Sequence, residues 1–176
     1  VLGRDLEQAR DALRRAERLQ ERIPAAWHTA MLRWFRGLFF ALQGRRDESL
    51  QQIKAALATF EQAGDQPQCA LARHGLLMAA YLSGETRSAE AMQRSEAELL
   101  RRGAHLPPSM RAAVLQQLAA APRLPNGDGE APAALELAVP VARLAMRGST
   151  AQTLLRELRE IVAELTERAV WVDEVD

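Results

Sequence analysis

The chain has 176 residues, which corresponds to one domain or to one domain with an appendage. Apolar residues make up 48% of it, so it can bury a sizeable core and is not expected to be disordered. Its 23 basic residues equal its 23 acidic ones, which removes the basic excess typical of nucleic-acid binders. Cys69 is the single cysteine, so no intrachain disulfide can form. Because no run of 18 apolar residues exists, we expect a cytoplasmic protein without membrane contact.

Apolar residues recur at three- and four-residue spacing over most of the chain and predict a series of helices. In chain order these cover residues 4–21, 26–42, 48–62, 67–83, 87–102 and 107–121. The second helix is apolar on nearly all sides, so neighbours must cover it on more than one face. The sequence therefore predicts a helical domain over residues 1–121.

The composition changes after this region. Residues 122–132 hold three prolines and two glycines, which is typical of a surface loop or linker. Pro140 interrupts residues 133–147. This segment is therefore expected to form either a helix broken near the proline or an extended segment. Residues 133–176 are therefore expected to form a separate C-terminal part.

A last helix is expected over residues 151–168, with Ser149 and Thr150 as its cap. The closing residues 170–172, Val-Trp-Val, have a strand-like composition. Within the helix, apolar residues recur at 4-3-4 spacing at Leu154, Leu158, Ile161 and Leu165. This spacing indicates either a homodimer seam or signalling helix, or a helix that caps the core of the chain.

Glycines recur at a fixed interval in the first part of the chain. Gly3, Gly44 and Gly84 fall 41 and 40 residues apart, each before a charged turn. Small residues follow with the same period at Ala9, Ser49 and Ala89. A period of this size is typical of helical repeat arrays, in which each helical hairpin stacks on the next one.

The unit that starts near Ala30 has a specific pattern of small, aromatic and turn residues. It consists of Gly37 and Phe40 in the first helix, Gly44 in the turn, and Ser49, Ile53 and Ala56 in the second helix. With these residues the repeat resembles the tetratricopeptide repeat in its longer form of roughly 40 residues per unit. The next unit agrees at Leu76, Gly84 and Ala89, and the resemblance covers residues 3–121.

The resemblance implies an all-α fold, a right-handed solenoid of helical hairpins that ends in a C-terminal capping or connector helix. The long form is typical of bacterial transcription regulators and signalling proteins. It therefore implies a non-catalytic regulatory or protein-interaction segment of a larger protein of that kind.

In such arrays the first helix of each hairpin lines a groove that binds peptides. With the repeat positions assigned as above, the groove residues are Met31, Trp34, Leu38, Leu71, His74, Met78 and Tyr81. The strip is mainly apolar and suits a helix or an extended apolar peptide, but it suits packing against another part of the same chain equally well. Three arginines nearby are either a clamp for a partner carboxylate or solvated side chains: Arg33, Arg36 and Arg73.

No motif in the sequence indicates catalysis. The histidines His28, His74 and His105 lie on separate elements, and none has a second metal ligand three or four residues away. No catalytic triad order or glycine-rich phosphate loop is present. We therefore expect no enzyme, cofactor or metal. Two alternatives to a protein-binding scaffold remain, a homodimerisation module and a sensor that binds a small effector between Trp34, His74 and Tyr81.

Overall fold

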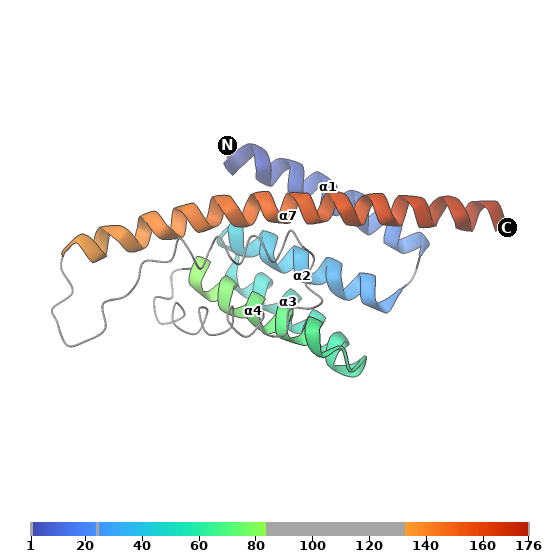
Figure 1. Cartoon of the computed structure of the whole chain (residues 1–176), viewed down its shortest axis with the longest axis horizontal. Helices are drawn as coiled ribbons and strands as arrows, with labels where there is room; N and C mark the ends of the chain where they lie inside the picture. Colours follow the sequence, from blue (N-terminus) through green and yellow to red (C-terminus); the bar gives the residue numbers. More distant parts are fainter. Residues whose placement is uncertain (1, 24, 84–132, 176) are drawn as a thin grey trace.

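The computed structural model describes residues 2–23, 25–83 and 133–175, and this part of the chain is entirely helical (Figure 1). The helices are α1 (Leu2–Arg22), α2 (Ala26–Leu42), α3 (Arg46–Gln62), α4 (Gln66–Leu82) and α7 (Ala133–Val175). Side chains are described for residues 3–23, 25–83 and 147–170. The all-α prediction is confirmed for these residues. The helices expected at 87–102 and 107–121, the linker at 122–132, and the repeat residues Gly84 and Ala89 lie outside the described residues.

The turns that separate α2, α3 and α4 are three residues long, and glycine gives each its shape. Gly44 and Gly64 have φ angles of +78° and +69°, in the left-handed region that side chains disfavour. At the start of α4, the carboxylate of Asp65 accepts a hydrogen bond of 3.2 Å from the amide of Gln68. Gly3, in contrast, lies inside α1 and not in a turn, so the glycine period does not begin where the sequence predicted.

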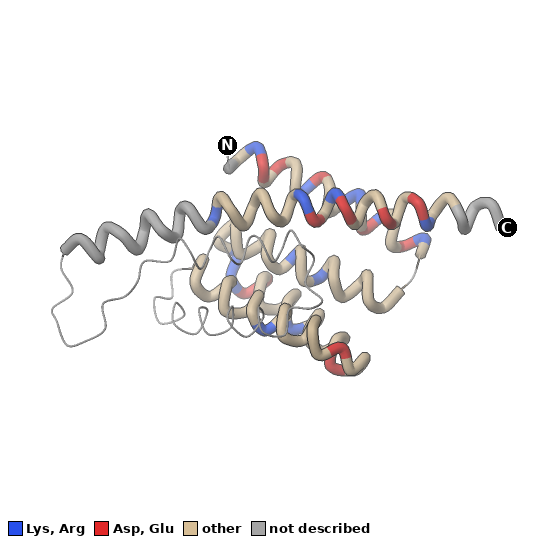
Figure 2. The backbone as a smooth tube through the Cα atoms, in the orientation of Figure 1, with Lys and Arg blue, Asp and Glu red and all other residues tan. Residues whose placement is uncertain are grey.

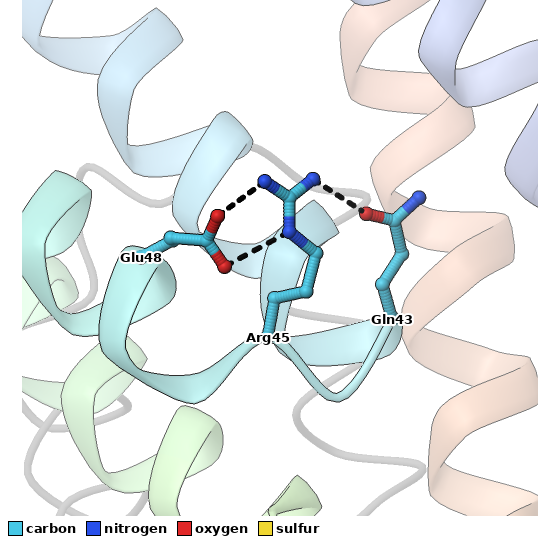
Figure 3. A network of polar contacts seen from close by, with 3 residues as sticks. All are labelled: Gln43, Arg45 and Glu48. Carbon is cyan, nitrogen blue, oxygen red and sulfur yellow. Dashed lines mark hydrogen bonds and ion pairs between the residues drawn. The ribbon is translucent and has the colours of Figure 1, made fainter.

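The turn between α2 and α3 is held by a small polar network (Figure 3). The Arg45 guanidinium donates a hydrogen bond of 2.9 Å to Glu48 and one of 3.4 Å to Gln43, and it lies 4.2 Å from the ring centroid of Phe40. The hydrogen bond from Arg45 lowers the pKa of the Glu48 carboxyl. The Arg45 side chain therefore forms these polar and ring contacts within the turn and its flanking helices.

Small residues allow the helices of this region to approach closely. A Cβ atom at Gly37 on α2 would overlap the side chain of Ile53 on α3. One at Gly75 on α4 would lie 2.5 Å from Nε1 of Trp34 on α2. These contacts bring α2, α3 and α4 together around one apolar core that also includes residues of α1 and α7.

The long helix α7 lies against α1 and α2 and reaches α4 (Figure 1). With 43 residues it spans roughly 65 Å, since a helix rises about 1.5 Å per residue. It extends beyond the other helices at both ends (Figure 1). Contacts of Arg147 with Leu42 and of Glu164 with His28 make it antiparallel to α2. It runs parallel to α1. Gln8 accepts a hydrogen bond from Arg159, and further along both helices Arg15 lines the same cleft as Thr166 and Glu167.

Three predictions for the C-terminal part are wrong. The helix passes through Pro140 without a break, Thr150 lies in its interior and not at its cap, and residues 170–172 are helical. A proline inside a helix removes one backbone hydrogen bond and crowds the preceding turn. Helical stability in proteins comes mainly from packing of an apolar face, which can offset a local cost elsewhere in the same helix. In α7 this face runs from Ala151 to Leu165 and packs into the common core.

Candidate protein-binding site

The seven side chains predicted to line a groove lie together on α2 and α4, and all are buried. Their exposed fractions are 7% or less: Met31, Trp34, Leu38, Leu71, His74, Met78 and Tyr81. All but His74 belong to one apolar core with residues of α7, and α7 contacts both α2 and α4. Helix α7 thus lies against the two helices that carry these residues.

Polar contacts hold α7 against α2 at two levels. Near one end of α2, His28 donates from Nε2 to Oε1 of Glu164 at 3.3 Å, since a carboxylate can only accept. Arg168, one turn further along α7, places Nη2 3.0 Å from the same oxygen. At the other end of α2, Arg147 donates to the carbonyl oxygen of Leu42, one of the carbonyls that a helix end leaves without a partner. These contacts set the register of α7 on α2.

The same contact region contains polar atoms that have lost water without gaining a partner. Nδ1 of His28, Nε of Arg147 and the hydroxyl of Thr150 are buried and form no hydrogen bond with the described residues. Each such atom costs about 1–3 kcal/mol relative to a satisfied one. The position of α7 on the rest of the chain is therefore less favourable than its apolar face alone would make it.

His74 is buried on α4, and Trp34 is buried on α2. Within the described part of the chain, neither ring nitrogen of His74 nor Nε1 of Trp34 has a hydrogen-bond partner. Desolvation by burial lowers the pKa of His74 to about 4, because the charged imidazolium cannot be hydrated there. The histidine is thus neutral at physiological pH. The buried region around His74 therefore contains ring nitrogens whose capacity for hydrogen bonds is unused.

The three arginines of the predicted carboxylate clamp do not converge. Arg36 on α2 pairs with Glu17 on α1, with Nε 2.9 Å from Oε1. Arg73 on α4 pairs with Glu61 on α3 at 3.0 Å. Arg33 is exposed and has no ion-pair partner within the described residues. Two of the three therefore already neutralise carboxylates of the chain itself.

The four residues predicted as a dimer or relay seam face the interior of the chain. Leu154, Leu158, Ile161 and Leu165 are buried in the common core. A homodimer formed through α7 would have to use another side of this helix.

Sequence patterns did not reveal the cleft on the outer side of the α1–α7 pair. It has a volume of about 650 Å³ and is lined by Asp11, Ala12, Arg15, Arg159, Val162, Ala163, Thr166 and Glu167. The nearest signal was the alternation of charges along the two segments, which Figure 2 shows as mixed red and blue along α1 and α7. Such alternation is common on solvated helix faces, so it does not by itself indicate a cleft.

Three further features concern the described residues only. No group of three or more histidine, cysteine, aspartate and glutamate side chains is placed to hold a metal ion. None of these helices combines the length and apolarity needed to cross a membrane. Cys69, a free thiol, is buried in the core.

Comparisons with known proteins give no family for the chain. No protein-family model matches it, and no curated protein or solved structure shows significant similarity. The resemblance to the tetratricopeptide repeat therefore rests on the residues of the chain itself.

Proposed function

We propose that the chain is a non-catalytic protein-interaction module with tetratricopeptide-like helical hairpins, in which α7 covers a surface that binds a helix of a partner protein. The binding surface would comprise the faces of α1, α2 and α4 on which α7 lies. In this proposal α7 is the regulatory element, and a partner gains access when α7 leaves. A role of this kind suits a segment of a bacterial signalling protein or transcription regulator.

One observation carries the proposal. Six of the seven buried side chains of the predicted groove, all but His74, share a core with α7, which lies far away in the sequence. This helix carries apolar residues at 4-3-4 spacing, as an amphipathic helical ligand does. Recognition of a helix by an apolar groove uses residues at this spacing. A surface that accepts α7 is chemically suited to accept a similar helix from another protein.

Buried polar atoms support the idea that α7 can be displaced. Nε of Arg147 and the hydroxyl of Thr150 lose water on docking and gain nothing in exchange. A partner helix with apolar residues at the corresponding positions would avoid this cost. Because α7 is tethered, however, it competes at an effective concentration on the order of millimolar, which keeps the surface closed to weak ligands.

Binding of a helical peptide to the full chain tests the proposal. The probe is a fluorescently labelled peptide with the sequence of residues 149–170. In the Leu158→Asp variant, a charge in the core weakens docking of the chain's own α7. We expect the peptide to bind this variant at least tenfold more tightly than the wild-type chain, as measured by fluorescence anisotropy.

A peptide that itself carries Leu158→Asp is the matched control and should not bind either chain. Circular dichroism confirms that the variant remains helical, and Leu158→Ala is the milder replacement if it does not. If a folded variant with loosened α7 fails to bind the wild-type peptide, the proposal is wrong.

A further inference from the structure

The outer cleft between α1 and α7 has features that point to a second copy of this chain as its partner. The residues that line it include two alanines, Ala12 on α1 and Ala163 on α7. Gln8 accepts a hydrogen bond of 3.0 Å from Arg159, so these two residues lie at the same level of the parallel pair. With that offset, Ala12 lies level with Ala163. Small residues at one level of two helices allow another helix to approach closely there.

Four charged residues surround this level in an alternating arrangement. Asp11 and Arg159 lie on the side of the cleft toward the start of α1, whereas Arg15 and Glu167 lie on the other side. Each helix therefore carries one positive and one negative group on opposite sides of the two alanines. All four residues are exposed, and the existing contacts of Asp11 and Arg159, with Arg10 and Gln8, are exposed as well.

We infer that this face binds a second copy of the chain in an antiparallel arrangement, with the twofold axis passing near Ala12 and Ala163. Rotation about that axis places α7 against the partner copy's α7, so that Arg159 of each copy meets Glu167 of the other. It also places Asp11 opposite Arg15. A pattern in which both helices reverse their charge across the axis is complementary to itself, which is the requirement for an isologous interface.

The cleft is formed by α1 and α7 together and includes none of the seven groove side chains, so the dimer would form while α7 lies on α1. The cleft is short and its contacts are largely charged, so we expect a weak, salt-sensitive dimer and not an obligate one.

Sedimentation velocity over a range of protein concentrations at low ionic strength tests the inference with the full chain. The wild type is expected to form a dimer at high concentration. Arg159→Glu should weaken the dimer at least tenfold, because it sets two acidic groups against each other. Lys54→Glu on the exposed face of α3 makes the same change in net charge and should leave the dimer unchanged.

The double variant Arg159→Glu/Glu167→Arg exchanges the two charges on α7 and should restore the dimer, since each α7 again meets its complement. In a parallel arrangement α7 would face the partner copy's α1, and the exchange would not restore it. A chain that stays monomeric at every concentration, or a dimer that Arg159→Glu does not weaken, would overturn the inference. Failure of the double variant would overturn the antiparallel arrangement.

Discussion

Replacement of Leu158 by alanine is expected to lower the free energy of unfolding by about 2–5 kcal/mol. Leu158 has no exposed surface and lies in the middle of the α7 face that packs into the common core. Truncation removes apolar contacts and leaves a cavity that rigid neighbours fill only in part. Urea denaturation followed by circular dichroism measures the loss.

The control for this variant is Glu160→Ala, two residues further along α7, where the side chain is exposed. A surface substitution of this kind should change stability by less than about 0.5 kcal/mol. If the two variants were equally stable, α7 could not be part of the folded core, and the assignment of its apolar face would be wrong.

Replacement of His74 by leucine is expected to change the pH dependence of stability. The pKa of His74 falls from 6.5 to about 4 on folding, so between these values the unfolded chain binds a proton that the folded chain does not. Stability rises with pH wherever the unfolded state binds more protons. The wild type should therefore lose stability as the pH falls from 6.5 toward 4, by a total of about 3 kcal/mol from this residue.

The leucine variant should lack this part of the loss. It should also be more stable at neutral pH by about 1–2 kcal/mol, because two buried nitrogens without partners are replaced by an apolar group of similar size. Carboxylates titrate in the same pH range, but they contribute equally to both proteins. The test is thus the difference between the two unfolding free energies, and a difference that is constant from pH 4 to pH 7 would contradict the account.

Local patterns predicted the first four helices well. Residues 26–42 were expected as a helix and form α2 with the same bounds, because an apolar segment between Pro24 and Gly44 has clear limits. The turn glycine Gly44 was predicted for a similar reason, since a left-handed backbone position has few alternatives to glycine.

The arrangement of α7 was not predictable from local patterns. The contact between His28 and Glu164 joins residues 136 positions apart, and the one between Leu42 and Arg147 joins residues 105 apart. A 4-3-4 apolar face has the same spacing whether it packs on its own chain or on another one. The path through Pro140 was likewise not predictable, because the local rule that disfavours proline inside a helix does not include the stability that the rest of a long helix supplies.

Native-state hydrogen exchange of the wild-type chain tests most directly whether α7 is a separable cover of the other helices. We expect residues 149–170 to become unprotected in a local opening whose free energy is clearly below that of α2 and α3, which should exchange only on global unfolding. Exchange of α7, α2 and α3 at one common free energy would show that α7 leaves only when the whole chain unfolds. That result would contradict its role as a displaceable regulatory element.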